Sequence, residues 1–360
     1  MTDQPRVLVT GAGGFIGTHL VSFLKKQGYW VRGVDIKYPE FSTSDANEFE
    51  LLDLRRWDNC LQATRGVDEV YALAADMGGM GFISNNHSQI LRNNTLINIH
   101  TLDAARVNGA SRYLFTSSAC IYPEYLQEEA DVTPLKEDDA YPAQPQDAYG
   151  WEKLISERLC AHYYQDFGLE TRIVRFHNIF GPLGTWNGGR EKAPAALCRK
   201  VAVAKLTGNP EVEIWGDGEQ TRSFCYIDDC VTGIYKLMRS DFSDPLNLGQ
   251  DRLVTINQLA DIIAAIAGIR IVKKHVPGPQ GVRGRNSDNS LLRKVLGWEP
   301  QISLEEGFSR TYAWIEEQVR AKLDAHPADD VLHALAHSRV VRVENGKKPL
   351  ETVRLATGTS

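Results

Sequence analysis

The sequence predicts an α/β fold, with a doubly wound parallel sheet in the first half of the chain and a smaller mixed α/β domain in the second. Three observations support this. Short apolar runs alternate with amphipathic helical stretches, a glycine-rich turn joins the first run to the first helix, and the rhythm changes after Gly181 and Pro182. Strands that alternate with helices are typical of parallel sheets. The 360 residues, 42% of them hydrophobic, suffice to bury such a core.

The expected strands of the sheet are short apolar runs that end where polar or small residues begin. Arg6 opens the first run, Arg-Val-Leu-Val-Thr, and Asp35 closes the second. Apolar residues at helical spacing mark the segments between several of these runs. We expect strands at residues 6–10, 30–35, 49–53, 69–75, 112–118 and 170–176, and the clearest helices at residues 88–107 and 149–167.

The second half has shorter elements and more turns. We expect helices at residues 193–205, 255–267 and 304–319, and a strand at 212–215 followed by a turn at 216–218. This organisation predicts a first domain of residues 1–178 to which 225–250 return, a second domain of residues 179–224 and 251–323, and a C-terminal tail of residues 324–360 that has no recognisable motif and ends in a loose segment at 355–360.

Composition excludes several classes of protein. Lys and Arg total 40 against 46 Asp and Glu, and this balance lacks the basic footprint of a nucleic-acid-binding protein. No apolar run approaches the roughly 20 residues that span a bilayer, and no signal peptide is visible. Six scattered cysteines indicate reduced thiols, and none of the nine histidines lies in a metal-binding cluster. We therefore expect a cytoplasmic protein without a metal, a membrane or a nucleic acid as partner.

A glycine-rich turn follows the first expected strand and opens the first expected helix. Its sequence is Gly-Ala-Gly-Gly-Phe-Ile-Gly. One glycine makes the tight bend, one lets backbone approach a pyrophosphate, and one lets helix and strand pack closely. The free N–H groups of the helix N-terminus attract the anion. The pattern predicts a Rossmann-type NAD site that includes Gly11, Gly13, Gly14, Phe15, Ile16 and Gly17.

Two acidic residues at strand ends are candidates for the adenosine side of this site. Asp35 lies 18 residues after Gly17, near the usual interval of about 20, and a carboxylate there accepts ribose hydroxyl protons and repels a 2′-phosphate. This favours NAD over NADP, although Lys37 nearby leaves the choice less sharp. Asp53 closes the third expected strand. It either reaches the adenine or forms an ordinary turn.

Tyr149 and Lys153 lie four residues apart and share one helix face. An ammonium beside a phenol favours the phenolate, which moves a pKa of about 10 towards the range of a general base. Tyr-x-x-x-Lys alone is common. In combination with the glycine-rich turn and with Ser117 and Ser118 at a strand end, it resembles the short-chain dehydrogenase/reductase superfamily, in its extended branch that acts on nucleotide sugars.

Cys120 stands where simple 4-epimerases of that superfamily usually have serine or threonine, and the Thr-Asp/Glu-Glu of 4,6-dehydratases is absent. A thiol with a free pKa of about 8.5 becomes a thiolate base beside cations. Buried packing is the commoner fate of a free cysteine. The place of Cys120 at a strand end beside Tyr149 favours the chemical role, and we assign the other five cysteines to packing.

Three further segments, at residues 74–82, 175–182 and 188–195, combine with Cys120 to resemble the family of GDP-mannose 3,5-epimerases from about residue 6 to 318. The resemblance implies that GDP-D-mannose is epimerised at C3 and C5 to GDP-L-galactose, with GDP-L-gulose as the C5 product. The reaction would pass through a transient 4-keto sugar, with NAD recycled. A homodimer is also implied.

The resemblance assigns roles to individual residues. Tyr149 with Lys153 would take the C4 hydroxyl proton, and Cys120 and Lys192 would exchange protons at C5 and C3 from opposite faces of the ring. Lys192 is otherwise a solvated or phosphate-binding lysine at a helix start, and Glu191 either grips sugar hydroxyls or favours the helix dipole. Ser118 would help to polarise the C4 oxygen and Gly78 would hold the sugar. The other implied positions are Asn178, Ala193, Lys200, Gln220, Thr221, Arg222 and Arg285 for the GDP-sugar, and Ala74 for the cofactor.

Three alternatives stay open at this point. The nearest is a GDP-L-fucose synthase-like 3,5-epimerase and 4-reductase, which pairs its cysteine with histidine and consumes NADPH. A 4-epimerase or dehydratase acting on another nucleotide sugar is the second. The third is a non-catalytic protein that senses NAD(H), although such proteins commonly lose the Tyr and Lys pair that stands here.

Overall fold

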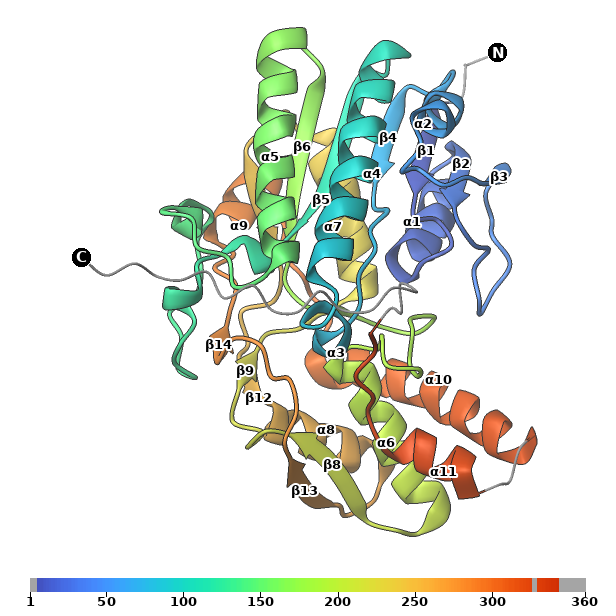
Figure 1. The fold of residues 1–360 in the computed structure, drawn as a ribbon, viewed down its shortest axis with the longest axis vertical. Helices are drawn as coiled ribbons and strands as arrows, with labels where there is room; N and C mark the ends of the chain where they lie inside the picture. The colour runs from blue at the N-terminus through green and yellow to red at the C-terminus, as the bar shows by residue number, and fades with distance from the viewer. Residues whose placement is uncertain (1–4, 326–328, 343–360) are drawn as a thin grey trace, which may run out of the picture.

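The computed structural model describes residues 5–325 and 329–342. Its centre is a seven-stranded sheet in the order β11-β6-β5-β4-β1-β2-β3, with every neighbouring pair parallel (Figure 1). This confirms the predicted doubly wound fold. The strands are β1 (Arg6–Thr10), β2 (Trp30–Asp35), β3 (Glu48–Leu51), β4 (Glu69–Ala72), β5 (Arg112–Ser118), β6 (Glu170–Phe176) and β11 (Pro245–Leu248).

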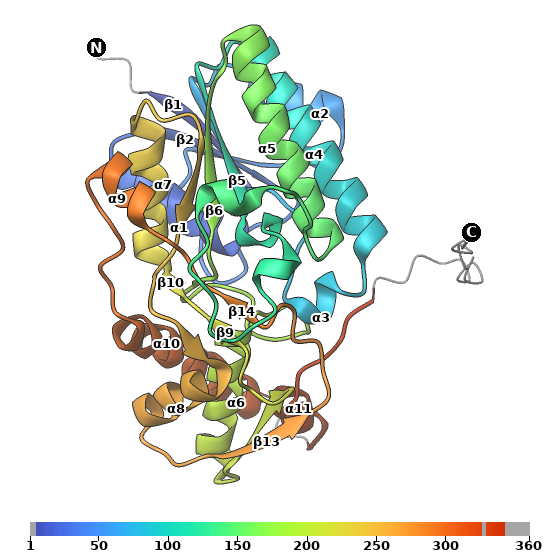
Figure 2. The same ribbon diagram turned by 90° about the vertical axis from the view of Figure 1, so that its left-hand side faces the viewer.

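Helices cover both faces of this sheet (Figure 2). Its central strands read as continuous apolar runs because both of their faces are buried. One face is covered by α2 (Trp57–Thr64), α4 (His87–Val107) and α5 (Ala148–Phe167), and the other by α1 (Phe15–Lys26), α7 (Ile227–Arg239) and α9 (Ser290–Leu296).

The fourth strand is shorter than its apolar run predicts. The run extends to residue 75, but β4 ends at Ala72. The amides of Leu73 and Ala74 donate to the hydroxyl oxygen of Thr10 at the end of β1, both at 3.1 Å, instead of to a backbone carbonyl of a neighbouring strand. The chain therefore turns away at the carboxyl end of β1, where the strand order changes direction. Such a reversal opens a crevice in which ligands of doubly wound sheets bind.

The second lobe lies beyond the carboxyl ends of the strands (Figure 1). Four helices pack together there beside a two-stranded parallel sheet. None of the helices in the described ranges is long and apolar enough to cross a bilayer. The elements of this half are α6 (Ala193–Thr207), α8 (Ile256–Ala267), α10 (Leu304–Ala325), α11 (Asp329–Ala336), β8 (Glu211–Trp215) and β13 (Val272–Val276), with the short strands β7 (Ile179–Phe180), β9 (Thr221–Arg222), β10 (Cys225–Tyr226), β12 (Val254–Thr255) and β14 (Gly284–Arg285), and α3 (Met80–Ile83) at the junction.

The two lobes share one hydrophobic core. A continuous cluster of buried side chains runs from β1 and α1 through α7 into α6, α8 and α10. Phe180 stacks on Phe308 of α10, with ring centroids 4.3 Å apart. This shared core fixes the two walls of the crevice relative to each other. Apolar packing therefore holds the elements of the two lobes that face the crevice in fixed positions.

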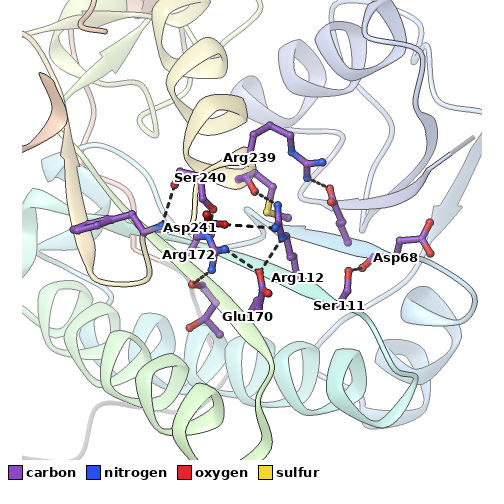
Figure 3. A network of polar contacts seen from close by, with 12 residues as sticks. Asp68, Ser111, Arg112, Glu170, Arg172, Arg239, Ser240 and Asp241 are labelled. Atoms are coloured by element: carbon purple, nitrogen blue, oxygen red, sulfur yellow. Dashed lines mark hydrogen bonds and ion pairs between the residues drawn. The ribbon is translucent and has the colours of Figure 1, made fainter. Parts of the chain in front are cut away.

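Ion pairs connect the amino ends of the central strands (Figure 3). Glu170 accepts from Arg112 and Arg172, at 2.9 Å in each case, and Arg239 at the end of α7 pairs with Glu69. Each of these cations thus has a carboxylate partner inside the protein. This edge of the sheet is neutralised internally.

The described part of the C-terminal tail returns towards the crevice. After α11, the chain passes α3, where the Val341 amide donates to the Gly81 carbonyl at 3.3 Å and Asn86 donates to the Val341 carbonyl at 2.8 Å. The sequence had no motif that indicated this return. Residues 343–360, with the predicted loose segment at 355–360, lie outside the described residues.

Candidate active site

A cavity of about 250 Å³ lies between the carboxyl edge of the sheet and the second lobe. Both lobes contribute to its walls, as expected for a ligand site of a doubly wound fold. Thr221, whose hydroxyl donates to the Ala130 carbonyl, does not line it. The cavity brings together the predicted residues Ile16, Gly78, Ser118, Cys120, Tyr149, Asn178, Glu191, Lys192, Ala193, Lys200, Gln220, Arg222 and Arg285.

The glycine-rich turn at one end of this crevice fits a dinucleotide. Gly11 has φ +69°, and a Cβ at Gly17 would clash with the Gly11 carbonyl, so α1 starts closer to β1 than any side chain permits. No side chain in the described ranges caps α1, so its first amides are available to an anion. Ala74 packs against Gly11 at the end of β4, on the same side of the site.

Asp35 lies beside this turn, at the end of β2. One of its carboxylate oxygens accepts from the Gly13 amide at 3.0 Å, and burial raises its pKa. Lys37 is exposed and pairs with Glu40 at 3.8 Å. Asp53 instead forms a local turn, where Arg55 binds its carboxylate at 2.7 Å and holds its pKa low. The two strand-end acids thus differ, because only Asp35 is directed at the glycine-rich turn.

Tyr149 lies in the first turn of α5, which begins at Asp147 as its N-cap. One turn later, the Lys153 ammonium donates to the Thr116 carbonyl at 3.0 Å and lies 5.6 Å from the centre of the Tyr149 ring. Burial raises the pKa of Tyr149 well above its usual value and lowers that of Lys153. The expectation that Lys153 lowers the Tyr149 pKa is therefore not met, because desolvation of the buried phenol is the largest cause of the shift.

Cys120 lies under the same turn of α5. A Cβ at Gly150 would clash with the Cys120 carbonyl, so the glycine of Tyr-Gly-Trp-Glu-Lys lets helix and thiol approach. Cys120 is partly exposed to the cavity, and its amide donates to the Ser118 hydroxyl at 3.2 Å. The remaining thiols are buried, and burial raises the pKa of Cys60 to about 11. The structure therefore separates Cys120 from the other five cysteines.

Lys192 enters the cavity from the opposite lobe, as the N-cap residue of α6. Its side chain is open to the cavity but crowded by protein atoms, and this desolvation lowers its pKa. Among the described residues, none forms a hydrogen bond or ion pair with its ammonium. Gly79 makes the approach possible, because a Cβ there would clash with the Glu191 carbonyl.

Arg222 and Arg285 form a basic surface on two adjacent parallel strands, where they are direct register partners. The Arg222 guanidinium donates to backbone carbonyls, including that of Val282 at 2.6 Å, and burial beside Arg285 lowers its pKa. Arg285 donates to Gln127 at 2.6 Å and to the Cys120 sulfur at 3.3 Å. Neither arginine has a carboxylate partner among the residues in the described ranges.

The remaining polar residues of the cavity are held by protein partners to different degrees. Lys200 pairs with Glu213 at 3.1 Å. Asn178, at φ 46°, donates to the Ser223 carbonyl at 2.9 Å. Gln220 donates to the Trp215 carbonyl, while its amide oxygen is buried without a hydrogen-bond partner in the structure as described. An acceptor of this kind suits a ligand hydroxyl.

The Glu191 side chain is not open to the cavity. One carboxylate oxygen pairs with Arg199 at 2.7 Å, and the other accepts from the Gly189 amide at 2.6 Å. Arg199 is fully buried and also donates to the His337 carbonyl at 3.1 Å. It thereby ties the loop before Lys192 to the returning tail. An arginine inside the apolar helix Ala-Pro-Ala-Ala-Leu-Cys-Arg-Lys-Val-Ala-Val was a signal that the sequence analysis did not use.

Ser338 and Arg339 of the tail also line the cavity, and the sequence analysis missed them. The Ser338 amide donates to Glu213 at 3.3 Å. Neither residue belongs to a pattern of spacing, glycines or charge, so only the path of the folded chain brings them to the site.

Comparison with known proteins agrees with this geometry. Residues 7–249 match the model of the NAD dependent epimerase/dehydratase family. The chain is 54% identical over 320 residues to GDP-mannose 3,5-epimerase 1 of Oryza sativa subsp. japonica, which covers 88% of this chain and 83% of that protein. Identity to GDP-mannose 3,5-epimerase of Arabidopsis thaliana is also 54%, over 88% and 84%. With GDP-L-fucose synthase of Escherichia coli (strain K12) it is 27%, over 88% and 98%.

Solved structures show the same fold. UDP-glucose 4-epimerase from Thermotoga maritima with UDP-glucose has a TM-score of 0.76 at 26% identity, over 87% of this chain and 99% of that one. MoeE5 in complex with UDP-glucose and NAD has a TM-score of 0.72 at 27% identity, over 87% and 99%. The cofactor is NAD, as the family and the fit of the glycine-rich turn indicate. The chain belongs to the NAD dependent epimerase/dehydratase family.

Proposed function

We propose that this protein epimerises GDP-D-mannose at C3 and C5, giving GDP-L-galactose and, after inversion at C5 alone, GDP-L-gulose. The observation that carries the proposal is the meeting of Cys120 and Lys192 in one cavity, from opposite lobes, beside Tyr149. Identity of 54% to two GDP-mannose 3,5-epimerases supports the choice of sugar nucleotide. A GDP-L-fucose synthase is half as similar.

The reaction requires a ketone at C4, because ring protons next to a hydroxyl-bearing carbon are too weakly acidic for a side chain to remove. NAD, when bound, supplies the oxidation at C4 and its reversal. Tyr149 takes the C4 hydroxyl proton. The Lys153 ammonium lies 5.6 Å from the centre of the Tyr149 ring, and Ser118, at the end of β5, lines the same cavity. Since burial raises the pKa of Tyr149, a second positive charge beside the phenol is needed for it to act as a base.

Inversion at each carbon needs a base on one face of the sugar and an acid on the other. The cavity has Cys120 on the wall formed by the sheet and Lys192 on the wall formed by α6. The lowered pKa of Lys192 suits proton transfer, because an acid or base works best when its pKa lies near the operating pH. These two groups exchange protons at C5 and C3 while C4 is a ketone.

The rest of the cavity binds the GDP part. Arg222 and Arg285 lack internal carboxylate partners in the described chain and suit a diphosphate, and Lys200 lines the same cavity. Asn178, Gln220 and the backbone at Gly78 add polar contacts. The Glu191 carboxylate and the Thr221 hydroxyl are already bound inside the protein, so these two side chains do not bind the GDP-sugar directly. Together with Ala193, they shape this part of the site.

The proposal extends to assembly as a cytoplasmic homodimer. Leu91 and Ile99 on α4, and Trp151 and Ile155 on α5, are large apolar side chains exposed on one outer layer. A second copy of the layer would bury them. Light scattering tests this: Ile155→Glu should give a monomer, whereas Val272→Glu, an exposed apolar site on β13, should not. A wild-type monomer would contradict the proposal.

The activity is tested by incubating the protein with GDP-mannose in heavy water without added reductant and reading the sugar by proton NMR. We expect deuterium at C3 and C5 together with GDP-L-galactose and GDP-L-gulose. No exchange at either carbon would make GDP-mannose the wrong substrate. GDP-4-keto-6-deoxymannose with NADPH and then UDP-sugars would follow, and turnover of one of these would identify an alternative member of the family.

A further inference from the structure

We propose that Arg285 is a positioning residue for Cys120, and that its guanidinium holds the sulfur as a thiolate before any substrate arrives. The catalytic consequence rests on the proposed function, in which Cys120 exchanges a ring proton. Arg285 was expected only as a contact for the GDP-sugar. The contact within the protein assigns it a different partner.

The geometry of the contact is specific. A terminal nitrogen of Arg285 lies 3.3 Å from the Cys120 sulfur, within hydrogen-bonding distance for sulfur. Gln127 accepts from the other end of the guanidinium at 2.6 Å. The Gln127 amide in turn donates to the carbonyls of Tyr122 and Pro123, each at 3.1 Å, and the residue is fully buried. The guanidinium is thus aimed at the sulfur by a fixed partner.

The direction of the hydrogen bond separates Cys120 from cysteines that serve in packing. Cys60 lies 3.1 Å from the Leu54 carbonyl and Cys225 lies 3.6 Å from the carbonyl of Tyr226. Carbonyl oxygens only accept, so these sulfurs donate and must carry their protons. A guanidinium only donates, so Cys120 accepts. Accepting from a cation is the arrangement that favours the thiolate.

Most of the charged groups around Cys120 are cations. Arg285 has no carboxylate partner in the part of the chain that the structure describes, so its charge is not already neutralised. The carboxylate of Asp147, at the start of α5, is held by the Gly150 amide at 2.9 Å. The titratable groups facing the thiol are Tyr149 and Lys153 from α5, Lys192 from the start of α6, Arg222 from β9 and Arg285 from β14.

The assignment gives Cys120 a defined state at the start of the reaction. A thiolate removes the ring proton next to the C4 ketone: the C–H bond breaks, the S–H bond forms, and the electron pair moves onto the enolate oxygen. The second terminal nitrogen of Arg285 forms no hydrogen bond with a residue in the described ranges and stays available to the substrate. Arg285 therefore couples the sulfur to the GDP-sugar side of the cavity.

The test is the rate of alkylation of Cys120 by iodoacetamide without substrate, followed by mass spectrometry of its peptide across about pH 5 to 9. In Arg285→Met, we expect the pH at which half of the sulfur reacts to rise by about one unit or more. The rate at neutral pH should then fall severalfold. Arg283→Met, two residues away at an exposed ion pair with Asp217, should match the wild type.

Two further measurements make the result decisive. Thermal stabilisation by NAD reports whether each variant is folded, and Arg285→Lys, which keeps the charge but not the fork, should recover part of the shift. An unchanged alkylation midpoint in folded Arg285→Met would overturn the inference, as would a rise in KM for GDP-mannose with unchanged kcat. Because alkylation needs no sugar, the midpoint shift remains readable even if GDP-mannose proves to be the wrong substrate.

Discussion

The two edges of the central sheet differ in how far the cations near them are paired with carboxylates of the protein. At the amino edge, Arg112 and Arg172 share Glu170, and Arg239 pairs with Glu69 (Figure 3). Beyond the carboxyl edge, three of the cations that line the cavity lack such partners in the described structure: Lys192, Arg222 and Arg285 have none. Lys200 pairs with Glu213, and Lys153, beside Tyr149, lies 3.9 Å from Glu152. The amino edge of the sheet is thus neutralised from within, whereas the cavity beyond its carboxyl edge is lined by three cations of the second lobe that have no carboxylate partner among the described residues.

The difference indicates what each edge is for. Burying a charge without a partner costs several kcal/mol, so an internal carboxylate is the stable solution where no ligand binds. A cavity that must hold an anion does the reverse, because an internal carboxylate would repel the ligand. Unpaired cations such as Lys192 and Arg222, whose pKa values are lowered by burial, are therefore a mark of function. We expect substitutions at the carboxyl edge to affect turnover and those at the amino edge to affect stability.

The largest effect is expected at Tyr149, which lines the cavity beyond the carboxyl edge of the sheet. Tyr149→Phe removes the group that takes the C4 hydroxyl proton, and turnover of GDP-mannose should fall by about a thousandfold or more. Enzyme-bound NADH should also disappear from the absorbance spectrum, since oxidation at C4 precedes all other steps. NAD binding, measured by calorimetry, should persist. Normal formation of bound NADH in Tyr149→Phe would remove this residue from its role.

Cys120 and Lys192 should show the next largest effect, confined to the epimerisation steps. Cys120→Ala and Lys192→Met should each slow the appearance of new sugars by about a hundredfold or more, while bound NADH still forms. Deuterium exchange read separately at C3 and C5 tells which carbon each group serves. Cys198→Ala is the matched control, because Cys198 is fully buried in α6 away from the cavity lining. Near-normal epimerisation by Cys120→Ala would return this thiol to a packing role.

A substitution at the amino edge tests the expectation that ion pairs there serve stability and not turnover. Glu69→Gln leaves Arg239 without its carboxylate, and the free energy of unfolding should fall by about 2 kcal/mol, because a half-buried cation loses its partner. Urea unfolding measures the change, and kcat should stay at the wild-type value. The control is Glu211→Gln, which breaks an exposed pair with Lys274 and should cost less than about 0.5 kcal/mol. A large loss of turnover in folded Glu69→Gln would break the division between the edges.

Local patterns in the sequence were enough to predict six of the seven strands of the sheet and the cofactor end, but not β11. Strands such as β5 and β6 have the bounds that their apolar runs predict, because period and flanking residues determine an element locally. The glycine-rich turn and Asp35 lie within one strand–helix–strand unit, so their spacing alone predicts that they meet. β4 ended early because the Thr10 hydroxyl, distant in sequence, captures the next amides.

The second lobe's part of the site was less accessible to prediction. Arg285 reaches Cys120 across 165 positions of sequence, and Arg339 reaches the cavity from a tail without any motif. Both contacts depend on how the two lobes pack over their shared core, which no local pattern encodes. The ion pair of Glu191 was missed for the same reason. Its partner Arg199 is only eight residues away, but Arg199 is also held by the returning tail, which no local pattern predicts.

The smallest expected effect concerns Asp35, the carboxylate beside the glycine-rich turn at the end of β2. Its partners in the described structure are amides, those of Gly13 and Ile36, so it too lacks an internal counter-charge, but its sign suits ribose hydroxyls and opposes a 2′-phosphate. Asp35→Ala should weaken NAD about tenfold and lower the preference for NAD over NADP, measured as a ratio of Kd values. Glu40→Ala, a nearby exposed acid, should leave the ratio unchanged. An unaltered ratio in Asp35→Ala would mean that another group binds the ribose hydroxyls. Asp35 would then not be the residue that favours NAD over NADP.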